Sequence, residues 1–424
     1  MMKGKTYQDI EVPVSKLEIG MHVVKLDRPW EETPFLLQSF IIRTLEELHQ
    51  LQYQCNYVYV QVRIEQLEEL QSRIGKAEPQ KTAATALLRG PQSKTRVKYL
   101  NRVSFDEAIE SSYMTFTSAR ALATSVMDGL RVGNTLNINE CRNVVEKIVD
   151  QVLDNKDTLK YLTLLKNKDA YTAEHSMNVC ILCATFARHL GLMEFEIKII
   201  AMCGLLHDVG KSKVPEEILN KPGRLTKEEA HIMAEHSTYG RNILMALKGE
   251  SRYAVDVAHS HHERVDGRGY PRSLTSAQIP YYAKIVTIVD AYDAMTSDRC
   301  YTRGKSSFQA LRVIFENAGS QFDTQLAKEF IQCIGFYNTG SLVQLESGQI
   351  AIVAKSNEDK PLRPKLAVIT DEHQKLRSKE MLIDLTNEKY RHYHIEKELP
   401  NGTAGIDVKS HIEKMLKKRR EEKQ

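Results

Sequence analysis

The stretch from His207 to Lys211, His-Asp-Val-Gly-Lys, contains three side-chain types that can act on phosphate esters. An imidazole lies beside a carboxylate, and an ammonium follows three residues after the carboxylate. Imidazole nitrogens and carboxylate oxygens bind divalent metal ions, a carboxylate can bridge two ions, and an ammonium pairs with phosphate oxygens. A His-Asp pair alone is more often incidental than functional, so its meaning depends on the other ligands in the chain.

The histidines of the chain are concentrated in one region. Of the 14 histidines, eight lie between residues 175 and 262. The candidate ligands, in chain order, are His175, His207, Asp208, His236, His261, His262 and Asp290. Five imidazoles and two carboxylates suit two divalent ions if one carboxylate bridges them. The bystanders are predicted to be His189, His231 and His259.

Each candidate ligand also has a non-functional interpretation. His175 can simply belong to a helix N-terminus, His236 can be a surface residue, and the pair His261-His262 can be a coincidence. Asp290 is the most informative single residue because it follows an apolar run. A buried carboxylate is unfavourable unless it is paired or bound to a metal. The pattern therefore favours a ligand at this position.

The region that carries these ligands has an almost wholly helical pattern. From residue 157 to residue 335, helices of moderate length are separated by short polar turns such as 220–223, and strand-like alternation is absent. We therefore predict an all-helical catalytic domain over 157–335 in a chain that is mainly α.

Two connecting helices are predicted over residues 104–156. Ser104 and Glu107 match a capping box that opens a helical pattern to about Leu130, and Asn139 can cap a second helix. These helices either pack on the catalytic domain or form a homodimer contact. The sequence leaves both interpretations open.

Smaller units are predicted at both ends. Residues 1–75 have the pattern of a small α+β regulatory domain, with a strand over 20–26 and a capped helix that starts after Thr44. A linker rich in Ala, Gln, Lys and Thr follows over 76–103. Residues 336–424 are predicted to form a β-rich appendage with a basic tail.

The appendage contains one hairpin signal and two further strand patterns. Segments 341–345 and 349–354 flank Glu346-Ser347-Gly348 and predict a β-hairpin. Two more strands are predicted over 364–370 and 381–385.

Composition limits the class of protein. Hydrophobic residues make up 42% and charged residues 27%, as in ordinary globular proteins. No apolar run approaches the ~20 residues of a membrane span, and the N-terminus lacks a secretory pattern. The close pair Cys180 and Cys183 lies in an apolar helical run and is interpreted as core packing. We expect a cytoplasmic protein, and the net charge of +4 is too small to indicate a nucleic-acid polymer as partner.

The stretch 207–211 and the eleven residues 261–271, HHERVDGRGYP, resemble the HD-GYP phosphodiesterases of bacterial cyclic-dinucleotide signalling. The segment 290–296, DAYDAMT, agrees with that family, and the resemblance covers about 157–335. More weakly, residues 8–64 are similar to the domain of unknown function that often precedes HD-GYP domains. The resemblance implies an all-α fold with metals at its centre and a cyclic dinucleotide, cyclic di-GMP above all, as substrate.

The resemblance further implies two divalent metal ions, each with its own ligands. A first ligand set would consist of His175, His207, Asp208 and Asp290. A second ligand set would consist of Asp208, His236, His261 and His262. Some members bind a third ion through a glutamate at the position of Tyr171, so two ions are expected here. Ligands of this kind suit iron or manganese, and zinc or nickel can bind in their place.

Substrate contacts are also implied by the resemblance. The expected contacts are Lys211, Arg264, Gly269, Tyr270, Pro271, Arg299 and Arg303. The chain departs from the family at Thr302, where a substrate-binding lysine is usual, and the next residue, Arg303, is the candidate to reach the same phosphate. The loop that contains Gly-Tyr-Pro either covers the substrate or docks a diguanylate cyclase partner.

Three functions compete on these grounds. In the first, a metal-activated water attacks a phosphorus of cyclic di-GMP, Asp208 and Lys211 are catalytic, and the products are linear pGpG and, after a second cut, GMP. In the second, the chain is a non-catalytic nucleotide sensor, which the complete ligand set argues against. In the third, it is an HD-type hydrolase that prefers cyclic GMP-AMP, a choice that depends on the shape of the pocket.

Overall fold

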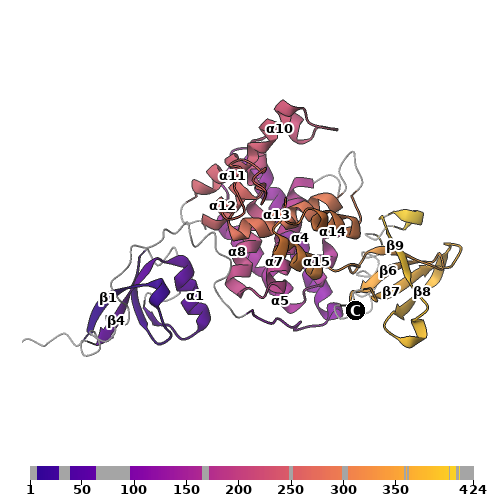
Figure 1. Ribbon diagram of the computed structural model, residues 1–424, viewed down its shortest axis with the longest axis horizontal. Helices are drawn as coiled ribbons and strands as arrows, with labels where there is room; N and C mark the ends of the chain where they lie inside the picture. Colours follow the sequence, from indigo (N-terminus) through magenta and orange to yellow (C-terminus); the bar gives the residue numbers. More distant parts are fainter. Residues whose placement is uncertain are drawn as a thin grey trace, which may run out of the picture. The chain divides into compact units, whose positions relative to one another are not determined.

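The computed structural model describes residues 7–27, 39–63, 96–164, 171–247, 252–297, 304–357, 360, 362–400, 402–406 and 410. The chain divides into two compact units, Met1–Leu87 and Leu88–Gln424 (Figure 1). Among the described helices, none has both the length and the apolarity that crossing a bilayer requires. Most of the predicted linker and the basic tail lie outside the described residues.

The N-terminal unit is an antiparallel sheet with one helix, which confirms the predicted α+β fold. Its strands, in the spatial order β1-β4-β2-β3, are β1 (Tyr7–Pro13), β4 (Tyr57–Arg63), β2 (His22–Leu26) and β3 (Phe40–Ile41). Helix α1 (Leu45–Gln54) begins with the expected cap, because the Thr44 side chain accepts the N–H of Glu47 and the Glu47 carboxylate accepts the N–H of Thr44. A small apolar core lies between the helix and the sheet.

The second unit contains the predicted helical domain. Its α-helices are α4 (Phe105–Arg131), α5 (Ile138–Asp154), α6 (Thr158–Leu162), α7 (Tyr171–His189), α8 (Glu194–Leu206), α9 (Glu216–Leu219), α10 (Lys227–Ala234), α11 (His236–Met245), α12 (Arg252–Ser260), α13 (Tyr281–Thr296), α14 (Ser307–Glu316) and α15 (Thr324–Ile334). A short 3-10 helix, η4 (Val209–Lys213), follows the His-Asp pair.

Helix α7 lies at the centre of this domain and contacts α8, α13 and α15 (Figure 1). It is buried on all sides from Ala173 to Arg188, as expected for a helix that is apolar around most of its circumference. Phe186 of α7 meets Phe330 of α15 edge to face, with ring centroids 5.1 Å apart. Polar residues within this helix are therefore surrounded by protein and need partners there.

The two connecting helices pack on the catalytic core, with α4 against α7 and η4, and α5 against α7 and α8. The capping box at Ser104 and Glu107 is present as predicted. The predicted cap of α5 is wrong by two residues: the Asn137 side chain, rather than that of Asn139, accepts the N–H of Glu140. The homodimer contact remains a prediction from the sequence.

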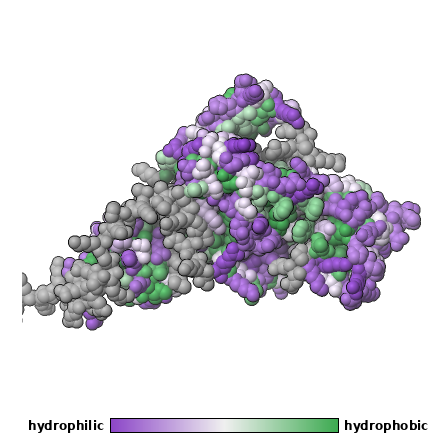
Figure 2. Space-filling model, in the orientation of Figure 1, coloured by the Kyte–Doolittle hydropathy of each residue, from purple (hydrophilic) through white to green (hydrophobic). Residues whose placement is uncertain are grey.

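The C-terminal part is a five-stranded antiparallel sheet. Its strands, in the order β8-β7-β6-β5-β9, are β8 (Leu376–Asp384), β7 (Lys365–Thr370), β6 (Ile350–Lys355), β5 (Leu342–Leu345) and β9 (Ile395–Leu399). The predicted hairpin is confirmed as β5–β6. Strand β9 was not predicted, because its sequence IEKEL contains three charged residues and its place in the sheet depends on pairing with β5. Figure 2 shows hydrophilic residues over much of the visible surface of this sheet and of α10.

Candidate metal centre

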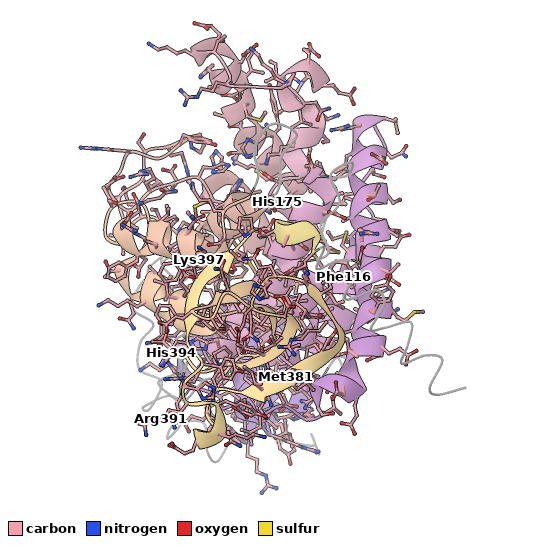
Figure 3. All side chains as sticks on the ribbon, turned by 90° about the vertical axis from the view of Figure 1, so that its right-hand side faces the viewer. Phe116, His175, Met381, Arg391, His394 and Lys397 are labelled. Carbon is pink, nitrogen blue, oxygen red and sulfur yellow. The ribbon has the colours of Figure 1, made fainter. Side chains whose placement is uncertain are left out.

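The seven predicted ligands come from five places in the fold and meet in one buried cluster. His175 lies near the start of α7 and Asp290 lies in α13, whereas the other five lie at the ends of helices. His207 and Asp208 follow α8, His236 begins α11, and the pair 261–262 follows α12. Figure 3 labels His175 among the helices, apart from the strand residues Met381 and Lys397 in the foreground.

Asp208 is at the middle of this cluster, and its two carboxylate oxygens face different partners. Oδ2 lies 3.3 Å from His207 Nε2 and 3.7 Å from His175 Nε2. Oδ1 lies 3.4 Å from His236 Nε2 and 3.6 Å from His261 Nε2. The carboxylate is only 1% exposed. One oxygen therefore faces histidines of the first predicted ligand set and the other faces histidines of the second, which is the arrangement expected of a bridging carboxylate.

The histidines are oriented by hydrogen bonds to their outer ring nitrogens. Nδ1 of His207 lies 2.7 Å from the carbonyl oxygen of Gly204, and Nδ1 of His236 lies 2.6 Å from that of Met233. Nδ1 of His261 lies 3.0 Å from the carbonyl oxygen of Ala258. A carbonyl oxygen only accepts, so each Nδ1 carries a proton, and in the neutral ring it is therefore Nε2 that presents a lone pair towards the cluster.

Several inward-facing atoms lack a suitable partner among the described residues. His207 Nε2 and Asp208 Oδ1 are buried without a hydrogen bond. Nε2 of His236 and Nε2 of His261 lie 3.2 Å apart, although both present lone pairs. Such an arrangement is unfavourable without a cation between the donors. The donors form overlapping groups with ligand atoms within 4.8 Å of one another, so the cluster fits divalent metal ions.

The electrostatic state of the cluster suits metal binding. Burial alone would raise the pKa of Asp208, but His207 and the Lys211 ammonium outweigh it and hold that pKa well below its usual range. Burial would also raise the pKa of Asp290, but other groups, chiefly His175 through its hydrogen bond, outweigh burial and lower that pKa. Burial lowers the pKa of His236 to about 3. Near neutral pH, the carboxylates are therefore charged and this imidazole is neutral, which are the forms that bind metals.

Lys211 lies at the edge of the cluster in η4. Its ammonium contacts Asp208 Oδ2, and its side chain is 19% exposed, so it reaches the centre from the solvent side. Gly210 makes this position possible: a Cβ there would lie 1.9 Å from the carbonyl oxygen of His236 and 2.4 Å from the nitrogen of Gly240. The glycine therefore lets η4 pack directly on α11. The first residue of α11 is His236, a predicted ligand of the second set.

The loop after the second ligand set is folded tightly against the ligands. The ring of Tyr270 stacks on that of His262 at 4.8 Å, and the Tyr270-Pro271 bond is cis. Gly269 is required by a close approach, because a Cβ there would lie 2.6 Å from the carbonyl oxygen of His262. The guanidinium of Arg264 donates hydrogen bonds within the molecule, so its predicted contact with substrate remains a prediction.

Two buried carboxylates that hold parts of the candidate site in place were missed by sequence reasoning. Glu263, only 1% exposed, accepts the backbone N–H of Arg272 at 2.7 Å and that of Leu274 at 2.9 Å. It thereby fixes the far side of the loop. Asp293, one helical turn after Asp290, contacts His175 and is treated below. The sequence signal was available in both cases, since each carboxylate lies directly beside or one turn from a predicted ligand.

Replacing Glu263 with glutamine is expected to lower the free energy of unfolding by about 1–3 kcal/mol. Glutamine offers one acceptor oxygen and points its amide group at the second buried N–H, which is left without a partner. Denaturant unfolding measures the effect, and Glu217→Gln, at an exposed position of α9, is the matched control. Equal stability of the two variants would contradict the anchoring role of Glu263.

The predicted bystanders lie away from the ligand cluster. His189 is 3.4 Å from Glu329 in an ion-pair position, and His231 is exposed. Burial, with Arg272 nearby, lowers the pKa of His259 to about 4. The predicted substrate contacts Arg299 and Arg303, together with Thr302 and the side chain of Tyr171, lie outside the described residues.

Family models match three parts of the chain. An HD domain model matches residues 161–326, a domain of unknown function (DUF3391) matches 9–141, and a KOW domain associated with HD domains matches 342–399. A cyclic di-GMP phosphodiesterase of Pseudomonas aeruginosa is 32% identical over 375 residues, which cover 88% of each chain. This chain belongs to the HD-GYP phosphodiesterase family.

Other relatives match less than half of this chain. A cyclic di-GMP phosphodiesterase of Thermotoga maritima is 35% identical over 178 residues, which cover 42% of this chain and 48% of that protein. A 3'3'-cGAMP-specific phosphodiesterase of Vibrio cholerae is 37% identical over 183 residues, which cover 42% of each. HD hydrolases are metal-dependent, and the described residues include a His/Asp cluster whose donors could hold a metal ion.

Proposed function

We propose that this chain is a phosphodiesterase that opens a bacterial cyclic dinucleotide, cyclic di-GMP in the first place, to linear pGpG. GMP is the product of a second cleavage when the linear dinucleotide is bound again. The observation that carries the proposal is the carboxylate of Asp208, whose two oxygens face two separate groups of histidines. The relative from Pseudomonas aeruginosa supports the substrate, because it matches this chain over nearly its whole length.

The proposed cofactor is a pair of divalent metal ions held by the first and second ligand sets. Neither set contains a thiolate, and the mixture of imidazole and carboxylate donors favours iron or manganese. When bound, the ions supply Lewis acidity, which acidifies water and stabilises negative charge on phosphoryl oxygens. The protein holds the donors in a buried frame, where such electrostatic effects are strongest.

The reaction that this site supports is an in-line substitution at phosphorus. A bond forms between the water oxygen and phosphorus, the bond from phosphorus to a ribose oxygen breaks, and that ribose oxygen takes a proton. Lys211 is proposed to pair with the phosphoryl oxygens as their charge grows, since its ammonium already contacts the bridging carboxylate. Tyr270, stacked on His262, is proposed to fix the edge of the substrate pocket.

Elemental analysis of protein purified under anaerobic conditions is expected to find about two metal ions per chain, as the two donor sets predict. Anaerobic purification prevents oxidation and loss of a ferrous ion. A folded and active protein that contains only one ion would contradict the dinuclear site. Three ions would show that the inference from Tyr171 is wrong.

Cyclic GMP-AMP is the second candidate substrate, because a relative in Vibrio cholerae is named for it. A panel of cyclic dinucleotides, with product analysis, decides between the two. We expect the highest kcat/KM for cyclic di-GMP. A higher kcat/KM for cyclic GMP-AMP would make that nucleotide the proposed substrate instead. Tight binding of a cyclic dinucleotide without turnover, in a protein that contains both metals, would favour the hypothesis of a non-catalytic nucleotide sensor. Docking of a cyclase by the Gly-Tyr-Pro loop remains a prediction.

A further inference from the structure

We propose that Asp293 is a positioning residue that acts through His175 and makes the first ligand set bind its metal ion more tightly than the second. The proposal rests on the two-metal site of the proposed function and adds an order to it: the first set fills before the second. Asp293 is not itself a ligand in this scheme.

His175 is held between two carboxylates on one face of α13. Its Nε2 lies 2.9 Å from Asp290 Oδ1, and its Nδ1 lies 2.8 Å from Asp293 Oδ2. The two aspartates are three residues apart, so they are neighbours on the helix surface. The ring of His175 therefore spans one turn of α13, with one nitrogen directed into the cluster and the other away from it.

Asp293 is itself fixed by neighbours on both helices. Asn178, one turn after His175 on α7, donates from Nδ2 to Asp293 Oδ1 at 3.3 Å. The hydroxyl of Ser297, directly after α13, donates to the carbonyl oxygen of Asp293 at 2.7 Å and also lies 3.2 Å from Asp293 Oδ2, so its proton is shared between the two oxygens. Asp293 is only 1% exposed. A buried carboxylate with several donors is a rigid acceptor, so it can fix both the tautomer and the orientation of the imidazole.

The contact between His175 and Asp293 differs from those that orient three of the other ligand histidines. Nδ1 of His207, of His236 and of His261 meets backbone carbonyl oxygens. A carboxylate partner makes an imidazole a stronger metal ligand than a carbonyl partner does, because its charge stabilises the cation across the ring.

The charges of the two ligand sets differ in the same direction. In the two-set assignment Asp208 serves both sets and Asp290 only the first, where it lies 2.9 Å from Nε2 of His175. Asp293 adds a further carboxylate on the other side of the same ring. The second set adds only histidines, and a neutral imidazole brings no negative charge to the ion. A divalent cation is therefore attracted more strongly to the first set.

The proposal is tested by titrating the metal-free full-length chain with Mn²⁺ and following free Mn²⁺ by electron paramagnetic resonance. Wild type is expected to bind in two steps of different affinity. His236→Ala should remove the weaker step and thereby assign it to the second set. In Asp293→Asn the tighter step should weaken by about 10- to 100-fold, the usual effect of losing such a partner, while the weaker step is unchanged.

Two further variants separate positioning from general damage. Tyr292→Phe removes a buried hydroxyl from the same helix, one that contacts Ser307 rather than the cluster, and should leave both steps unchanged. Ser297→Ala removes one donor to Asp293 and should weaken only the tighter step, by less than Asp293→Asn. Equal weakening of both steps by Asp293→Asn, or an unchanged tighter step, would overturn the proposal. A single step with two Mn²⁺ per chain would overturn the proposed order, whereas a single step with one Mn²⁺ per chain would refute the two-metal site of the proposed function.

Discussion

Replacing Asp208 with alanine is expected to remove metal retention and to lower turnover by roughly a thousandfold or more. The substitution deletes both oxygens that link the two ligand sets, and it leaves the Nε2 atoms of His207 and His236 without their shared carboxylate. Metal ions supply several kcal/mol of transition-state stabilisation, and each 1.4 kcal/mol corresponds to about tenfold in rate. Elemental analysis and a turnover assay on one preparation measure both effects.

The controls for Asp208→Ala are histidines outside the cluster. His189→Ala and His259→Ala should retain metal and turnover, with a change in stability at most, since His189 pairs with Glu329 and His259 is in none of the donor groups of the described residues. Circular dichroism shows whether each variant is folded. Full activity in a folded Asp208→Ala protein would mean that the bridging role has to be abandoned.

Replacing Lys211 with alanine is expected to lower kcat by roughly a hundredfold or more while metal content stays as in wild type. An ammonium has no lone pair, so it cannot be a ligand, and its contact with Asp208 places its charge where phosphoryl charge would develop. Loss of one donor that acts mainly in the transition state affects kcat more than substrate binding.

Lys213→Ala is the matched control for Lys211→Ala. Lys213 lies in the same 3-10 helix but is exposed, so its loss should change kcat little. Loss of a solvated lysine at a helix end changes stability by only a few tenths of a kcal/mol. Unchanged turnover in Lys211→Ala would remove this residue from the site, and loss of metal would show that its role is structural.

The ligand cluster and the fold differ in how far the sequence could predict them. The histidines and aspartates of the two sets are rare, chemically distinct residues at characteristic spacings, so the sequence could single them out. The partners of their outer nitrogens are mostly backbone carbonyl oxygens, such as that of Gly204. Every residue has a carbonyl oxygen, so only the folded helix ends reveal which of them orient the ligands.

The helix starts and strands also differ in how far local sequence could predict them. The capping box at Ser104 was predictable because two side chains at fixed spacing satisfy each other. At the start of α5, Asn137 and Asn139 are both good caps, and the choice depends on where the helix packs. Strand β9 has little apolar character and is defined by its pairing with β5, a contact over more than 50 residues that local sequence does not contain.

The most direct test of the account is a turnover assay of the anaerobically purified, metal-containing chain with cyclic di-GMP in water enriched in ¹⁸O. Hydrolysis by an in-line attack of water predicts linear pGpG that carries one labelled oxygen in its new terminal phosphate, detected by mass spectrometry. The product should not form with Asp208→Ala. Bound but unopened cyclic di-GMP in a protein that contains both metals would contradict the account, because the cluster would then bind the nucleotide without catalysing hydrolysis.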